Sequence, residues 1–221
     1  MTLTDEARAE LVANTQKKKP MAHTKYSRAH PGKFGLSIDW ETTGSTFGGD
    51  STIKYQGISF GAVIFDTETF EPIKTLYREL QFDDTKYEWS DGAEKIHGLS
   101  REYLKANGVS REEALTDLLT LILEYIGAES KIFFLGHNVD FDIDFTMQLA
   151  KDFDIVLQAH HVKLETSGAG FICIGKYKSN DVFEFFTGKV RDGSHNALDD
   201  SLMALETVRN MRALMNTALG V

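Results

Sequence analysis

The chain has 221 residues, of which 42% are hydrophobic and 26% are charged, and these proportions suit one globular domain with a full-sized core. Its apolar runs are too short to cross a bilayer, which excludes a membrane-spanning protein. A single cysteine, Cys173, excludes an internal disulfide and fits a reducing compartment. Because the N-terminus also lacks the pattern of a secretory signal, we expect a cytoplasmic protein with no membrane partner.

Charge is distributed unevenly along the chain. Residues 1–35 hold seven basic and three acidic groups, whereas the whole chain has a net charge of −9. We therefore expect a basic, peripheral leader at 1–32, which is either a solvated tail or a nucleic-acid contact, and one domain at 33–221. The acidic body fits poorly with phosphate binding through Lys and Arg alone, but bound cations can reverse the local field.

The predicted order has strands first and then alternating helices and strands. The expected strands are 34–39, 55–66, 70–82 and 131–136. The second and third are close enough in sequence to favour antiparallel pairing. The expected helices are 101–106, 111–126, 141–153 and 196–216, and no element is assigned within 155–189, which has no clear period. This order predicts an α/β fold: a three-layer domain with a mixed central β-sheet and helices on both faces.

The first acidic cluster closes the apolar strand at 34–39. In a strand, side chains two residues apart share a face, so Asp39 and Glu41 project together while Trp40 packs on the other side. Two carboxylates on one face repel each other unless a cation lies between them. A solvated strand end is the alternative, but the apolar strand before the acids and the Thr-Thr-Gly turn after them favour a cation site.

The second acidic cluster follows the fourth predicted strand. Asn138 is expected to cap the next helix, and Phe141 is expected to anchor that helix to the core. Asp142 lies beside the apolar stripe of the helix, so packing fixes its direction. His137 is expected to be a structural hydrogen-bonding residue rather than a catalyst.

The third acidic cluster opens the C-terminal helix. Asn196 is expected to cap this helix, and Asp200 lies one turn inside it. His195, on the entering loop, can reach over the cavity that Asp200 faces. Asp199 is a rival for the inward position, and the pattern of residues leaves that choice open.

Together the clusters supply four acids that can converge and one histidine. Two divalent ions roughly 3.5–4 Å apart can flank a scissile phosphate, one activating a water molecule and one holding the leaving oxygen. Carboxylates suit hard cations such as Mg²⁺ or Mn²⁺, and an imidazole with a pKa near ~6.5 can take a proton from water near neutral pH. Because the sequence has no zinc spacing, P-loop or nucleophile elbow, the clusters indicate a metal-dependent phosphodiester hydrolase.

In this order the three clusters resemble the motifs of the DEDDh exonucleases of the ribonuclease-H-like superfamily. The family pattern is Asp-x-Glu-Thr-Thr-Gly, His-Asn-x-x-Phe-Asp and His-x-Ala-x-x-Asp. In this chain it reads Asp39-Trp40-Glu41-Thr42-Thr43-Gly44, His137-Asn138-Val139-Asp140-Phe141-Asp142 and His195-Asn196-Ala197-Leu198-Asp199-Asp200. The segment Lys95-Ile96-His97-Gly98-Leu99-Ser100 also resembles the proofreading branch of the family, and the likeness covers about residues 34–216.

The resemblance implies a ribonuclease-H-like fold and a role for each motif residue. The residues that would hold two ions of Mg²⁺ or Mn²⁺ are Asp39, Glu41, Asp142 and Asp200, which favours Asp200 over its neighbour. His195 would be the general base. The residues that would contact the 3′-terminal nucleotide are Thr42, Thr43, His97, Asn138 and Phe141.

By the same resemblance we expect a 3′–5′ exonuclease that releases nucleoside 5′-monophosphates from DNA, with single strands favoured. The implied partners are nucleic-acid 3′ ends and a polymerase or replication protein. The nearest alternative is the same chemistry on RNA or short oligoribonucleotides, but no residue reports on recognition of the 2′-hydroxyl. A nucleic-acid-binding module that has lost catalysis is a further alternative, although all four acids and the histidine are present.

Overall fold

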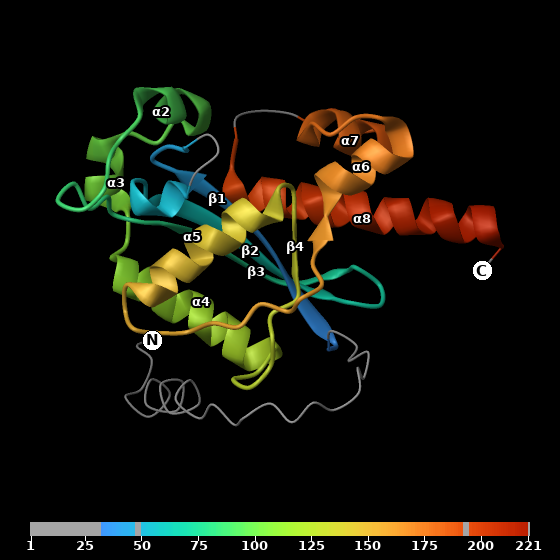
Figure 1. Cartoon of the computed structure of the whole chain (residues 1–221), viewed down its shortest axis with the longest axis horizontal. Helices are drawn as coiled ribbons and strands as arrows, with labels where there is room; N and C mark the ends of the chain where they lie inside the picture. Colours follow the sequence, from blue (N-terminus) through green and yellow to red (C-terminus); the bar gives the residue numbers. More distant parts are fainter. Residues whose placement is uncertain (1–31, 47–49, 192–194, 221) are drawn as a thin grey trace.

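The computed structural model describes residues 32–46, 50–191 and 195–220 (Figure 1). Its strands are β1 (Phe34–Thr42), β2 (Gly57–Asp66), β3 (Pro72–Glu79), β4 (Phe134–Gly136) and β5 (Leu164–Glu165). Its helices are the short 3-10 helix η1 (Ser51–Ile53) and the α-helices α2 (Asp91–His97), α3 (Arg101–Asn107), α4 (Arg111–Tyr125), α5 (Val139–Lys151), α6 (Thr166–Ile174), α7 (Ser179–Thr187) and α8 (Ala197–Leu219). Within these ranges no helix is long and apolar enough to cross a membrane. The expected leader at 1–32 lies outside the described residues apart from Gly32.

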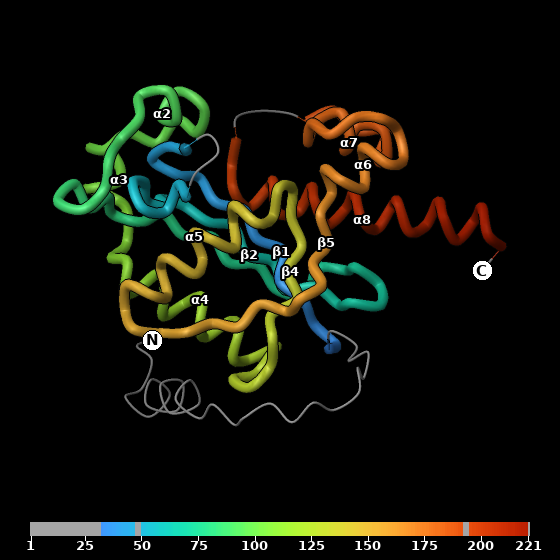
Figure 2. The backbone as a smooth tube through the Cα atoms, in the orientation of Figure 1, coloured from blue at the N-terminus to red at the C-terminus, as the bar shows by residue number. Residues whose placement is uncertain are grey.

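The five strands form one mixed sheet in the order β3-β2-β1-β4-β5 (Figure 2). Strands β2 and β3 pair antiparallel, as predicted, β1 pairs antiparallel with β2, and β4 and β5 add in parallel. Strand β1 pairs with β2 along its whole length, but only Leu36 and Ser37 of β1 pair with β4. The last residues of β1 therefore have one edge that no strand of the described chain covers.

Hydrophobic residues pack on both faces of the sheet and make the domain three layers thick (Figure 1). On one face, Ile38 and Phe60 of the sheet pack with Leu118 of α4 and Phe145 of α5. On the other face, residues of β2 and β4 pack with α8, and this second core consists of Val63, Phe65, Phe70, Phe133, Leu135, Ala204 and Leu205. The predicted three-layer α/β fold with a mixed sheet is confirmed, and helices α6 and α7 extend the α8 layer.

The observed elements differ from the predicted ones mainly where hydrophobic residues have no regular spacing in the sequence. The fourth strand is shorter than predicted, because Ile132 forms only an isolated bridge with Ala159. Helices α2, α6 and α7 are absent from the prediction. In α6, Phe171 and Ile172 are exposed while Gly170 is buried, so this helix has no apolar stripe that a sequence pattern could reveal.

Gly61 of β2 allows α8 to lie directly on the sheet. A Cβ atom at this position would lie 2.2 Å from the Cα atom of Leu198, so helix and strand touch through their backbones. Ser201 of α8 donates from Oγ to the Gly61 carbonyl at 2.7 Å, and its own carbonyl accepts from Ser37 Oγ at 2.9 Å. Because Gly61 pairs with Asp39 in the sheet, these contacts place the first turn of α8 beside Asp39.

Replacing Gly61 with alanine is expected to lift α8 from the sheet. The added methyl group meets helix backbone rather than a flexible side chain, so the free energy of unfolding should fall by about 2–3 kcal/mol or more. Gly92→Ala in α2 is the matched control, because its nearest neighbour is Ser90 Oγ at 3.4 Å and alanine favours a helix. Urea denaturation of both variants checks this, and equal stability of Gly61→Ala and wild type would refute the close approach of α8.

Candidate active site

Asp39 and Glu41 lie on the uncovered end of β1, on the face that α8 covers. Ser37, two residues before Asp39, bonds to α8, whereas Trp40 points to the opposite face, where its Nε1 donates to Thr146 Oγ1 of α5 at 2.9 Å. The Trp40 side chain is only 4% exposed. The predicted alternation is therefore present, and the two carboxylates share a face because Trp40 is anchored in the core.

Asp142 reaches the edge of β1 from the first turn of α5. Because β4 ends before this point, the Trp40 backbone N–H has no strand partner on that edge and donates to Asp142 Oδ1 at 2.9 Å. The Asp142 side chain is buried. The backbone carbonyl of Asp142 accepts from Thr146 Oγ1 at 2.7 Å. A strand that extends beyond its neighbour thus supplies the hydrogen bond that fixes this carboxylate beside the first motif.

The carboxylate of Glu165, at the end of β5, holds the start of α5. It accepts from the backbone N–H groups of Asn138 at 2.9 Å and Val139 at 2.8 Å. The prediction that the Asn138 side chain caps this helix is wrong, because the left-handed backbone of Asn138 (φ 59°) turns its amide toward Glu165 and its side chain makes no cap bond. His137 Nδ1 is hydrogen-bonded to Thr166 Oγ1 at 2.8 Å, which is consistent with the structural role expected for His137.

Asp200 projects from the first turn of α8, and Asn196 caps this helix as predicted. The Asn196 side-chain oxygen accepts from Leu198 N at 3.0 Å and Asp199 N at 3.3 Å. The Asp200 side chain is only 11% exposed, whereas Asp199 is exposed. The inward position, which the pattern of residues left open, therefore belongs to Asp200.

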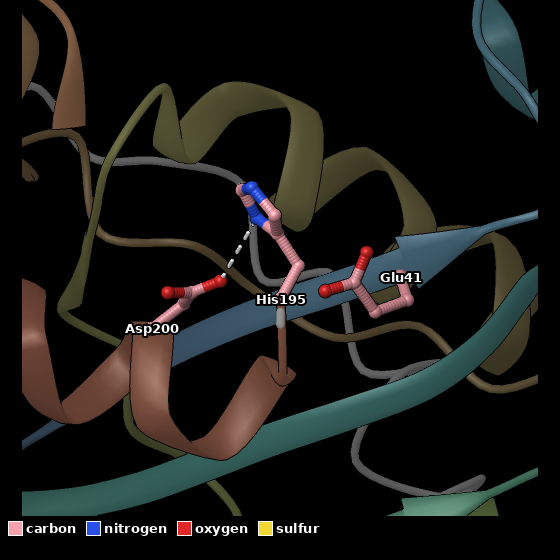
Figure 3. Close-up of side chains that lie close together, drawn as sticks. All are labelled: Glu41, His195 and Asp200. Atoms are coloured by element: carbon pink, nitrogen blue, oxygen red, sulfur yellow. Dashed lines mark ion pairs between the residues drawn. The ribbon is translucent and has the colours of Figure 1, made fainter. Parts of the chain in front are cut away.

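The side chains of Glu41 on β1, His195 just before α8 and Asp200 on α8 lie close together (Figure 3). Ligand atoms of Glu41, His195 and Asp200 all lie within 4.8 Å of one another. His195 Nδ1 is 3.5 Å from Asp200 Oδ2, and 49% of the His195 side chain is exposed. The imidazole therefore stands at the solvent-facing rim of the group, and the carboxylates lie deeper.

The four acids are close enough to perturb one another. Burial raises the pKa of Asp39 well above its ordinary value, and the charges of Asp142, Asp200 and Glu41 raise it further. Burial and the charge of Asp200 raise the pKa of Glu41 to about 7. Burial also raises the pKa of Asp142 and of Asp200. The sheet and two helix starts thus concentrate negative charge that water solvates poorly.

Arg191 belongs to this group but is absent from the predicted site. Its Nη2 atom lies 2.8 Å from the Asp200 carboxylate, and its Nη1 atom lies 3.1 Å from His195 Nδ1. Its charge opposes the rise in the pKa of Asp39 and Glu41. A basic residue four positions before His195 is the signal in the sequence that could have identified it.

Two of the predicted nucleotide contacts are threonines in the turn after β1. Thr43 is fully buried, and its Oγ1 accepts from Gln56 N at 3.0 Å. The Thr42 hydroxyl donates to the Gly44 carbonyl at 2.8 Å. Both hydroxyls are therefore used to hold the turn, and a nucleotide would meet this turn chiefly through its backbone.

The other three predicted contacts lie around the acids on different elements. Phe141 is partly exposed and its ring packs on Phe145 at 4.8 Å, while Asn138 is exposed. His97, at the end of α2, is only 6% exposed, and its Nδ1 accepts from Leu99 N at 3.0 Å. Burial lowers the pKa of His97, which favours a neutral ring. Phe141 is thus open to a ligand on one side, whereas His97 is largely enclosed.

The donor set fits divalent cations. The Oδ1 atom of Asp200 is buried and, among the residues that the structure describes, has no hydrogen-bond partner. Hard cations such as Mg²⁺ and Mn²⁺ prefer oxygen ligands, and a cluster of acids that raise one another's pKa is relieved when cations bind. Asp39, Glu41, Asp142 and Asp200 are the residues that would hold them.

A mixed sheet of this order, with acids on β1 and at the starts of α5 and α8, has the ribonuclease-H-like fold of solved exonuclease structures. The RNase_T model, described as exonuclease, matches residues 36–208, and the chain belongs to this exonuclease family. Its three motifs resemble those of the DEDDh exonucleases, and exonucleases of this family depend on divalent metals. Comparison with curated protein sequences gave no significant match.

Solved structures share the fold at low sequence identity. A zinc-bound complex of E. coli exonuclease I with single-stranded DNA matches with a TM-score of 0.65 and 16% identity over 82% of this chain. The chain spans 41% of that protein. The nuclease domain of 3′hExo, a DEDDh family member bound to rAMP, matches with a TM-score of 0.61 and 18% identity, covering 82% of this chain and 92% of that one. A 3′-exonuclease that recognises a histone mRNA stem-loop matches with a TM-score of 0.58 and 17% identity over 82% of both chains.

Glu41→Gln is expected to stabilise the protein in EDTA, increasingly as the pH rises. The pKa of Glu41 is raised from 4.5 to about 7, so the folded state is favoured while the group is protonated. That contribution is fully present below the unfolded value of 4.5 and is lost as the pH rises through about 7. At about pH 8 the variant should exceed wild type in free energy of unfolding by on the order of 3 kcal/mol, with little difference near pH 4.5.

Urea denaturation at both pH values measures this difference. Glu88→Gln is the control, because Glu88 is exposed and forms only a surface ion pair with Lys54. A gain for Glu41→Gln that is the same at both pH values would contradict charge repulsion as the cause.

Proposed function

We propose that the protein is a divalent-metal-dependent 3′–5′ exonuclease that hydrolyses phosphodiester bonds at the 3′ end of DNA and releases nucleoside 5′-monophosphates. The observation that carries this proposal is the convergence of Asp39, Glu41, Asp142 and Asp200, with His195 at the rim. A cluster of acids with strongly perturbed pKa values is a candidate functional site, because catalytic groups need pKa values matched to their task. Membership of the exonuclease family supports the same chemistry.

In this proposal Asp39, Glu41, Asp142 and Asp200 would hold two ions of Mg²⁺ or Mn²⁺. When bound, such ions activate a water molecule and stabilise the leaving oxygen. The protein contributes rigid placement: the Trp40 N–H fixes Asp142, and the backbone contact at Gly61 fixes the turn that carries Asp200. Such placement is effective because the ligands need little rearrangement during the reaction.

His195 is the proposed general base. It stands at the exposed rim, with a ring nitrogen within 4.8 Å of ligand atoms of Glu41 and Asp200, so a water molecule held over the acids lies within its reach. An imidazole is suited to this step because its ordinary pKa is near ~6.5. The exposed ring can also pass the proton on to solvent.

Single-stranded DNA is the proposed substrate, with Phe141 beside the terminal base and the turn at Thr42 and Thr43 around its sugar. The segment 95–100 resembles the proofreading branch, and E. coli exonuclease I is a structural neighbour bound to single-stranded DNA. RNA is a second candidate, because two neighbours are bound to rAMP or recognise a histone mRNA stem-loop. A polymerase or replication partner and a cytoplasmic location stay predictions.

Asp142→Asn tests the metal assignment. The amide oxygen can still accept from Trp40 N, so the fold should persist, but the loss of a charged ligand should lower kcat/KM about 10³-fold or more. Asp140→Asn is the matched control, because Asp140 lies two residues earlier on the same helix, is exposed and pairs with Lys163.

The assay is a gel time course on matched 5′-labelled DNA and RNA with Mg²⁺, Mn²⁺ or EDTA. A metal-dependent ladder that shortens from the 3′ end is expected, faster on DNA than on RNA. Faster shortening of RNA would overturn the DNA assignment alone. Full activity of Asp142→Asn would overturn the metal site, and no degradation by wild type would favour a binding module.

His195→Ala tests the general base. Hydrolysis should fall about 10²–10⁴-fold near pH 7, with partial recovery toward about pH 9 as free hydroxide replaces the lost base. The measurement is the pH dependence of kcat/KM for wild type and variant on the same labelled strand. Parallel pH profiles for the two proteins would remove His195 from this role.

A further inference from the structure

Arg191 occupies the position of a cation beside the acids. Its Nη2 atom lies 2.8 Å from both carboxylate oxygens of Asp200, and only one of the two, Oδ2, receives a hydrogen bond. The Arg191 side chain is only 8% exposed. The guanidinium therefore compensates the charge of Asp200 but leaves its Oδ1 without a donor. The two carboxylate oxygens of Asp200 that face Arg191 are also the atoms that would bind a divalent ion.

The same guanidinium engages the proposed base. Arg191 Nη1 lies 3.1 Å from His195 Nδ1. The same Nδ1 atom lies 3.5 Å from Asp200 Oδ2, so the guanidinium and the carboxylate face one ring nitrogen. Arg191 therefore lies against both a proposed metal ligand and the proposed base.

A divalent ion on Asp200 and a guanidinium on the same oxygens oppose each other. Two positive charges a few ångströms apart repel strongly where water is scarce. The divalent ion and the guanidinium would both bind the Asp200 carboxylate, since both of its oxygens lie within contact distance of Arg191 Nη2. Occupancy by one should therefore weaken the other.

We propose that Arg191 is an internal counter-cation that competes with a divalent ion for Asp200, and that it leaves its contact with His195 Nδ1 when the ion binds. This inference rests on the proposed function, because it concerns the same metal-binding acids.

The alternative role for Arg191 is purely structural, and it predicts the opposite sign. If Arg191 only held Asp200 in place, its removal would loosen a ligand and weaken ion binding. If Arg191 competes with the ion, its removal strengthens ion binding. Ion affinity, measured without nucleic acid, therefore separates the two roles.

The test is isothermal titration of Mn²⁺ into Arg191→Met and wild type. Methionine removes the charge and keeps much of the side-chain length, and we expect about tenfold tighter binding of Mn²⁺ to the variant. Arg209→Met is the matched control, because Arg209 lies on α8 and pairs with Glu71 on the surface, with 2.7 Å between Nη1 and Oε2. This control should leave the Mn²⁺ affinity within about twofold of wild type.

Thermal unfolding supplies a second readout. In EDTA, Arg191→Met should melt at a lower temperature than wild type, because the acids lose their counter-charge, and Mn²⁺ should raise its Tm by more than that of wild type. Arg191→Lys keeps the charge and provides a test if the methionine variant does not fold. Its Mn²⁺ affinity should stay near that of wild type, and tenfold tighter binding to it would contradict competition by charge.

Equal or weaker binding of Mn²⁺ to Arg191→Met would overturn the proposal and make Arg191 a positioning residue for Asp200. Because these measurements use Mn²⁺ alone, they do not depend on nuclease activity. A chain that binds Mn²⁺ more tightly after the substitution but degrades no strand would refute the proposed function and retain the inference.

Discussion

Mutual repulsion among four acids held in one place is the constraint on which the rest of the structure depends. Burial raises the pKa of Asp39 and Asp142, and the charges of the neighbouring acids add to the effect. Flexible side chains would relieve this repulsion by turning toward water, so the acids stay together only if the backbone holds them. The protein therefore mounts them on three separate elements, β1, α5 and α8, each fixed by contacts that involve main-chain atoms.

The difference in length between β1 and β4 makes this arrangement possible. A longer β4 would pair with Trp40 and occupy the N–H group that holds Asp142. Instead β4 ends at Gly136, and the left-handed backbone of Asn138 turns the chain into α5 at once. Glu165 then binds the exposed amides at the start of that helix. A fifth carboxylate thus stabilises the helix that carries Asp142, at the cost of one more negative charge nearby.

Local sequence patterns predicted those parts of the fold that depend on interactions between residues close together in the sequence. Alternation placed Asp39 and Glu41 on one face of β1, and Asn196 caps α8 within its own turn. Interactions between distant segments left no such pattern. Glu165 acts on amides 26 and 27 residues away, and its role depends on a backbone turn rather than on its neighbours. Arg191 lies only nine residues before Asp200, but the family motifs do not include it, so the motif pattern did not identify it.

An acidic protein and a polyanionic substrate are compatible if attraction is confined to the bound ions. With a net charge of −9, the chain is expected to repel phosphates at long range and to bind weakly along a strand. Burial raises the pKa values of the four acids of the site, whereas two divalent ions would neutralise all four carboxylates. Affinity for a phosphate then exists only where the ions sit, beside the turn that would receive a strand end. On this argument the acidic body favours recognition of an end over the interior of a strand, and ion binding controls when that recognition begins.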